Sequence, residues 1–322
     1  MPPRMFARWL VLVSLLLLAF LGTVTTLNLT LYSASGFVSS YLHAVAGHDL
    51  EGARRMPGVT VGAGATDELL TPAALVSLDG IHLIRDSDEG AGRHTVLYGY
   101  TIGGAAGTSS FVVQYTGARL GVFSGWRFVD SPAAVIDITV NNGTGVVANG
   151  IALPDTTPGR PHSYRVLVPS RVVLTHTSRY LTAAPVTALV DAPASVVPAI
   201  VEIQANHTFV REVQKQLDSY LATCATQKVL LPTGCPIGKP ITDRIQDAPT
   251  WSIVTYPIVT IVPGNTAGSW QIPETAAAAH LVVTVKSIFD GRISTVNEDV
   301  PFTIRYLITF TDDGGLAITA EN

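Results

Sequence analysis

The chain contains two cysteines, Cys224 and Cys235, which lie close enough in sequence to pair with each other or to share a metal ion. A structural metal site needs further Cys, His or carboxylate ligands, and the segment between the two cysteines contains none. An even number of cysteines outside the cytoplasm favours pairing. We therefore predict a Cys224–Cys235 disulfide and no metal site. Closing so short a loop stabilises the fold by about 3 kcal/mol at most.

A second group with chemical potential consists of four arginines in one short stretch, with a single acidic residue, Asp155, at its edge. Such a group is suited to an anionic wall polymer or to lipid headgroups. The alternative is an ordinary solvated face. The predicted anionic-ligand patch comprises Arg160, Arg165, Arg171 and Arg179.

Other reactive residue types do not form a recognisable site. The sequence has no zinc-protease, nucleophile-elbow, phosphate-loop or Ser-x-x-Lys motif. His43 and His48 lack the i, i+4 spacing of a helical metal pair, so we interpret both as solvated. Three tryptophans in predicted strands are either sheet core or a platform for a glycan or peptide: Trp126, Trp251 and Trp270. We predict no catalytic residue and no cofactor.

The element that must position everything else is an uncharged apolar run at residues 9–27. As a helix it is long enough to cross a hydrocarbon core of about 30 Å. Arg4 and Arg8 precede it, which predicts a cytoplasmic N-terminus and an extracytoplasmic remainder. The competing interpretation is a signal peptide cleaved near residues 33–35, which would release a secreted protein.

Composition narrows the class of protein. Only 14% of the residues are charged and the net charge is −4, which argues against a nucleic-acid partner. Abundant Ala, Val, Thr and Gly with few Lys is typical of a GC-rich bacterial gene. We expect a single-pass bacterial membrane protein that contacts lipid through residues 9–32.

The periodicity of the apolar residues predicts an α+β fold. Residues 1–8 form a short cytoplasmic segment and residues 9–32 the transmembrane signal-anchor. Residues 33–132 form an α+β domain, residues 133–196 a small all-β module, and residues 197–322 a second α+β domain with the disulfide.

The first domain opens with helical patterns at residues 35–56 and a further helix at residues 71–75, before the period changes to that of strands. In the β module, Asn142-Gly143 predicts a hairpin between residues 135–141 and 146–153. The last domain begins with an apolar helical stripe and continues as strands. The stripe comprises Phe209, Val213, Leu217, Tyr220 and Cys224.

A helix followed by an antiparallel sheet occurs twice, at residues 37–128 and 209–319. This plan resembles the cone-shaped (cystatin-like) fold of the nuclear-transport-factor-like superfamily. Residues 99–114 with 123–128 look like strand pairs of single-pass bacterial envelope proteins, including teicoplanin-resistance-associated ones. Residues 135–153 and 164–168 are similar to the small β module of those proteins, and residues 220–236 resemble a segment of exported proteins of unknown role.

The resemblance implies a further possibility, because cone folds also include small-molecule isomerases and cyclases with a pocket Asp or His and a Tyr. His94, Tyr98, Tyr100 and Asp130 are the residues here that fit those roles. The alternative is that the tyrosines face the core while His94 and Asp130 lie at the surface. Fold alone does not imply activity.

Three functions are expected on these grounds. The first is a non-enzymatic envelope protein, a scaffold or sensor whose outer part binds a protein or a cell-wall component. The second is a scaffold subunit of a secretion or conjugation machine. The third is an exported isomerase-like enzyme, which requires a deep apolar pocket with convergent polar groups.

Overall fold

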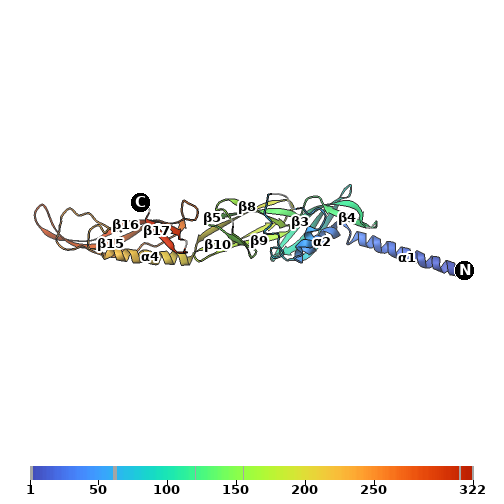
Figure 1. The fold of residues 1–322 in the computed structure, drawn as a ribbon, viewed down its shortest axis with the longest axis horizontal. Helices are drawn as coiled ribbons and strands as arrows, with labels where there is room; N and C mark the ends of the chain where they lie inside the picture. The colour runs from blue at the N-terminus through green and yellow to red at the C-terminus, as the bar shows by residue number, and fades with distance from the viewer. Residues whose placement is uncertain (1–2, 61–63, 120, 155, 312, 321–322) are drawn as a thin grey trace. The chain divides into compact units, whose positions relative to one another are not determined.

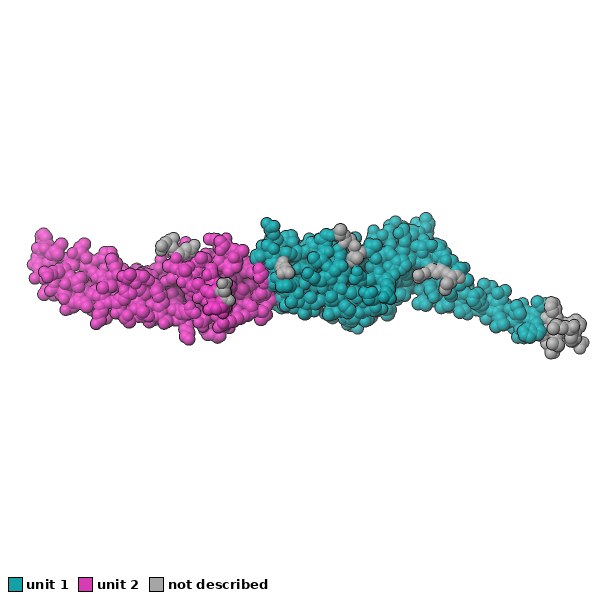
Figure 2. Space-filling model, in the orientation of Figure 1, with its two compact units in different colours: residues 1–140, 145–175, 185–201 teal, residues 141–144, 176–184, 202–322 magenta. Residues whose placement is uncertain are grey.

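The computed structural model describes residues 3–60, 64–119, 121–154, 156–311 and 313–320. The chain divides into two compact units, coloured separately in Figure 2. Unit 1 comprises residues 1–140, 145–175 and 185–201, and unit 2 comprises residues 141–144, 176–184 and 202–322. As predicted, the fold is α+β, with one apolar N-terminal helix followed mostly by antiparallel sheet (Figure 1).

Helix α1 (Pro3–Leu29) contains the apolar run. Residues Trp9–Leu29 are long and apolar enough to cross a membrane, and none of this segment is buried inside the protein. A helix that is apolar on all sides and exposed along its length needs a non-aqueous surrounding. α1 is therefore a candidate membrane anchor.

Helices α2 (Ala34–Ala46) and α3 (Leu50–Arg54) come next, and α2 packs on a four-stranded sheet. Ser33 caps α2 by accepting a hydrogen bond from the amide of Gly36 at 3.0 Å. Tyr41 lies at the centre of this core, fully buried, with its ring edge against Phe111 and Phe128. Its hydroxyl donates to the carbonyl of Val168 at 2.8 Å, and burial raises its pKa well above the usual value.

The sheet under α2 is an antiparallel meander in sequence order. Its strands are β1 (Leu78–Gly90), β2 (Arg93–Ile102), β3 (Ala105–Arg119) and β4 (Phe123–Phe128). The predicted helix at residues 71–75 is wrong. The segment is a turn closed by a hydrogen bond from Ala74 to Thr71, because Leu69, Leu70 and Leu75 are all buried around it and five residues are too few for a stable helix.

Seven strands form the next sheet, in the order β7-β6-β9-β10-β11-β5-β8. They are β5 (Ala133–Asn141), β6 (Val146–Ala148), β7 (Ile151–Leu153), β8 (Pro161–Leu167), β9 (Ser170–Thr177), β10 (Leu181–Val190) and β11 (Val196–Ala205). Inward and outward side chains alternate strictly along β5.

The hairpin predicted at Asn142-Gly143 is wrong, because β5 pairs with β8 and not with the segment that comes directly after it. A tight type I′ turn needs a positive φ at both central residues, and only Asn142 has one, at 65°. Gly143 packs closely on its neighbour, because a Cβ there would lie 2.8 Å from the end of the Ile203 side chain. The two-residue hairpin lies instead at Asn149 and Gly150, with φ of 47° and 84°.

The C-terminal sheet lies in unit 2, where helix α4 (His207–Ala225) accompanies it. Two long strands, β15 (Trp270–Lys286) and β16 (Ile293–Phe310), form its centre. The shorter strands are β12 (Arg244–Ile245), β13 (Thr250–Thr255), β14 (Val262–Pro263) and β17 (Leu316–Ala320). A bulge between Ile272 and Thr275 accommodates Pro273, and β15 continues past it.

Candidate binding site between α4 and the C-terminal sheet

Helix α4 begins at a well-formed cap, where the Asn206 side chain accepts a hydrogen bond from the amide of Phe209 at 3.0 Å. Its apolar stripe is turned to the sheet as predicted, with one correction. Leu221 is fully buried and takes the core position that the sequence pattern assigned to Tyr220, which is 37% exposed. Tyr220 therefore lies at the edge of the stripe, where its hydroxyl can reach other groups.

The sheet offers α4 two rows of side chains that cross its strands. Trp270, Ile308 and Ile318 lie opposite one another in register, and so do Ile272, Tyr306 and Ala320. Residues directly opposed in an antiparallel sheet point to the same face, so each row presents one surface. The second row places a single tyrosine between small and aliphatic residues.

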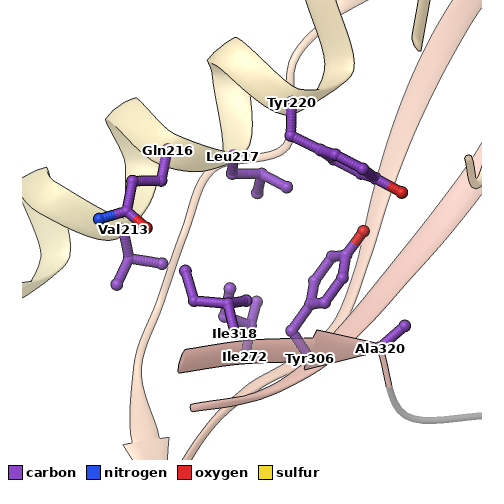
Figure 3. A pocket seen from close by; sticks show the side chains of 8 residues that line it. All are labelled: Val213, Gln216, Leu217, Tyr220, Ile272, Tyr306, Ile318 and Ala320. Carbon is purple, nitrogen blue, oxygen red and sulfur yellow. The ribbon is translucent and has the colours of Figure 1, made fainter. Parts of the chain in front are cut away.

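Helix and sheet enclose a cavity of about 270 Å³. Its walls are largely aliphatic, and Val213, Leu217 and Ile272 are buried in them. Figure 3 shows the hydroxyl ends of Tyr220 and Tyr306 pointing toward one another at one side of the cavity. The described residues that line it are Val213, Gln216, Leu217, Tyr220, Ile272, Tyr306, Ile318 and Ala320.

The two tyrosines form the polar end of the site. Their ring centroids are 6.4 Å apart at nearly perpendicular planes. Tyr220 donates its hydroxyl hydrogen to the carbonyl of Gly234, which leaves its oxygen to accept from Tyr306. Burial, and after it the neighbouring Tyr220, raises the pKa of Tyr306, so its phenol remains a neutral donor.

The disulfide holds the Gly234 carbonyl, which accepts the hydrogen bond from Tyr220, in place. Cys224, in the last turn of α4, is bonded to Cys235, which adjoins Gly234. Gln227 braces the same loop, because its side-chain oxygen accepts from the amide of Thr233 at 3.0 Å and its side-chain nitrogen donates to the carbonyl of Thr233 at 3.3 Å. The predicted cysteine pairing is thus present, and it lies beside the cavity.

The four arginines of the predicted anionic patch have different surroundings. Arg165 is 6% exposed, makes an ion pair with Asp67 and donates to the carbonyl of Ala65 at 2.9 Å. Arg160 is exposed and Arg171 is half-buried in unit 1, whereas Arg179 lies in unit 2 with its guanidinium 4.8 Å from the ring centre of Tyr180. The predicted ligand site of four arginines is not proposed further, because the Arg165 side chain is buried and paired with Asp67.

The residues suggested for isomerase-like chemistry all lie in unit 1, and three of them, His94, Tyr98 and Tyr100, have local partners there. Tyr98 donates to the carbonyl of Ser35 at 3.0 Å, and the hydroxyls of Tyr100 and Ser109 are 2.7 Å apart. His94 contacts Asp86 through Nδ1 at 2.7 Å and stands edge-on to the ring of Trp126. Asp130 is exposed. Burial raises the pKa of both tyrosines, which keeps them protonated.

The remaining candidates also have local structural surroundings. His43 contacts the carbonyl of Ser39, and His48 contacts that of Pro72. Trp126 is half-buried, and Trp251 and Trp270 are buried in the sheet. Within the described residues no three His, Cys, Asp or Glu side chains gather as a metal site would require.

One residue of the cavity, Tyr306, carries a signal in the sequence, although the periodicity of apolar residues alone does not distinguish it. Tyr306 occupies an inward position of β16, between the buried Ile304 and Ile308, and a hydroxyl at such a position needs a partner. Comparison of the chain with protein-family models, curated proteins and solved structures gives no match, so the geometry of the site is the basis for proposing a function.

Proposed function

We propose that the chain is a membrane-anchored, extracytoplasmic envelope protein that acts by binding, as a sensor or scaffold, and performs no catalysis. The observation that carries this proposal is the cavity between α4 and the sheet, apolar on most sides and provided with a phenolic pair at one end. Pockets for small ligands combine an apolar lining with a few fixed polar groups. The ligand that fits is neutral, small or chain-like, and carries one hydrogen-bonding oxygen.

The contacts of Asn28 and Tyr32, at the end of α1 and directly after it, with residues 122–126 support a retained anchor. Tyr32 stacks on Phe123 with ring centroids 4.5 Å apart, and its carbonyl accepts from the Trp126 indole at 2.8 Å. The side-chain amide of Asn28 bonds the carbonyl of Val122 and the amide of Ser124, each at 2.8 Å. Cleavage at residues 33–35 would remove both residues and the Ser33 cap of α2.

Orientation and compartment rest on charge and on the disulfide. Arg4 and Arg8 before the apolar run favour a cytoplasmic N-terminus, and a Cys224–Cys235 bond persists in an oxidising compartment. The composition favours a bacterial cell membrane. The packing of α2 and α4 on antiparallel sheets supports two cone-like domains, at residues 33–132 and 197–322, on either side of the β module at 133–196.

The lining of the cavity supports binding over catalysis. It contains no carboxylate, imidazole, amine or thiol among the residues that the structure describes. General acid–base catalysis requires a group whose pKa lies near the working pH, and the pKa of Tyr306 is raised away from it. A neutral phenol still serves as a hydrogen-bond donor to a bound ligand.

The test uses the full chain in detergent-free nanodiscs with methyl decanoate, a neutral chain with a terminal ester, as the probe. Ile318→Phe places an aromatic ring, bulkier than the native side chain, in the cavity. It should weaken the binding of methyl decanoate at least about tenfold, which corresponds to about 1.4 kcal/mol. Thr319→Phe is the matched control, because successive strand residues point to opposite faces and Thr319 is exposed. Failure of the wild type to bind the ester, or equal binding by Ile318→Phe, would contradict the proposal.

A further inference from the structure

The turn between β15 and β16 exposes apolar side chains that the binding cavity does not explain. Phe289 is 97% exposed, Ile288 76% and Ile293 62%. Single exposed aliphatic residues are ordinary, but three at one hairpin tip form a small protruding apolar cap. We call residues 287–293 the β15–β16 tip.

The backbone of this tip is held in one conformation. The amide of Gly291 donates to the carbonyl of Ser287 at 3.1 Å, and the amide of Ser287 donates to the carbonyl of Arg292 at 2.9 Å. The Ser287 hydroxyl accepts from the amide of Phe289 at 3.2 Å. With the backbone fixed, Ile288 and Phe289 are presented to the surroundings without a loss of backbone entropy on contact.

The charges around the tip have a positive excess. Lys286, Arg292 and Arg244 are exposed, and Arg244 lies opposite Lys286 in the β12–β15 pair. Two carboxylates lie nearby: Asp290 accepts from the amide of Arg292 at 3.1 Å and forms an ion pair with its guanidinium at 3.8 Å, and Asp243 accepts from the amide of Ile288 at 3.3 Å, which leaves an excess of one positive charge. An apolar cap beside basic side chains matches the interface of a bilayer that contains anionic lipid.

The size of the cap distinguishes a bilayer from a protein partner. Three side chains offer on the order of a few hundred Å², whereas a stable protein interface buries about 1,200–2,000 Å². A bilayer needs no complementary surface, and its affinity grows with each inserted apolar side chain. We propose that the β15–β16 tip inserts Ile288 and Phe289 into the interfacial region of a lipid bilayer, as a second membrane contact besides α1.

The test places an indole at the tip. The full chain with Trp9→Phe, which removes the indole of α1, is reconstituted in nanodiscs of phosphatidylcholine and phosphatidylglycerol, with and without Phe289→Trp. Quenching by bromine-labelled acyl chains is measured with the labelled lipid in the disc, and separately in added vesicles of the same composition. Ile258→Trp is the matched control, because Ile258 is 82% exposed and lies in the connection between β13 and β14, outside the β15–β16 tip.

Insertion predicts that the indole introduced by Phe289→Trp is quenched in one of the two arms, while that introduced by Ile258→Trp is not. The arm that responds shows whether the tip enters its own membrane or a second one. Adding Ile288→Asp should lower the quenched fraction roughly tenfold. The proposal is overturned if neither arm quenches the tip more than the control, or if the tip indole shifts to the blue without quenching, which would place it against protein.

Discussion

The hydroxyl of Tyr220 is hydrogen-bonded to the backbone carbonyl of Gly234, the residue beside the disulfide-bonded Cys235. Tyr220 is therefore fixed at both ends, by the helix that carries it and by the loop that the disulfide closes. Because Tyr306 lies next to Tyr220 at one side of the cavity, the position of the Cys224–Cys235 loop affects the polar end of the candidate site.

The disulfide should therefore affect both stability and ligand binding. Replacing both cysteines by Cys224→Ser and Cys235→Ser should lower the free energy of unfolding by about 3 kcal/mol, as the loop-entropy relation gives for a closed loop of this length. Chemical denaturation monitored by tryptophan fluorescence measures it. Reductant should destabilise the wild type and leave the double variant unchanged; an equal response of the two proteins would show that the bond does not stabilise the fold.

Loss of the Tyr220 hydroxyl should lower both the affinity for methyl decanoate and the free energy of unfolding. Tyr220→Phe removes the hydrogen bond to Gly234 while the disulfide remains, and we expect a loss of about 1 kcal/mol in stability and a weaker affinity for methyl decanoate. Lys215→Ala, at an exposed position of α4 outside the lining, is the control. Isothermal titration with the full chain separates the two effects, and unchanged affinity in Tyr220→Phe would exclude the phenolic pair from recognition.

The anchor should remain attached in the mature protein. Protein extracted from membranes should have an intact mass that includes residues 9–32, because Tyr32 and Asn28 belong to the packing of unit 1. Tyr32→Ala should reduce stability by roughly 1 kcal/mol through loss of the ring contact with Phe123. A mature N-terminus near residue 35 would contradict this prediction.

The ion pair between buried Arg165 and the partly exposed Asp67 should matter more than the exposed arginines. Asp67→Ala leaves Arg165, which is 6% exposed, without its carboxylate partner, and should cost roughly 1–3 kcal/mol in stability. Arg160→Ala, at an exposed position, should change stability by less than about 0.5 kcal/mol. Thermal unfolding of the two variants measures the difference, and equal effects would show that Arg165 gains nothing from Asp67.

Local patterns in the sequence were enough for α1, α2 and α4, because helical periodicity and capping residues are encoded within a few turns. Strand pairing was not accessible in the same way. Asn142-Gly143 carries the signal of a hairpin, yet β5 pairs with β8, and the Asn142 side chain donates to the Glu202 carboxylate and to the carbonyl of Ile203. Pairings between distant segments depend on the whole core, which no short window contains.

The candidate site depended on such distant pairings even more strongly. Ile272, Tyr306 and Ala320 become neighbours only when β15, β16 and β17 are in register, and the cavity exists only because α4 lies over that row. Arg165 shows the opposite case, a residue that the sequence assigned to a ligand patch. The spacing of charges along the chain placed it there, whereas the fold buries it beside Asp67.

The raised pKa of Tyr306 predicts a specific response to alkaline pH. In the unfolded chain a tyrosine loses its proton near its usual pKa of about 10. In the folded protein burial and Tyr220 hold the pKa of Tyr306 higher, so the folded state retains this proton when the unfolded state does not. Its contribution to stability is therefore complete below pH 10 and is lost as the pH rises above that value.

Tyr306→Phe should flatten this part of the stability profile. The difference in tyrosinate absorbance between wild type and Tyr306→Phe should be absent near pH 11 in the folded proteins and should appear in denaturant. Tyrosinate absorbance from Tyr306 in the folded protein at that pH would show that the cavity is open to water and that its phenol is not the neutral donor that ligand recognition requires.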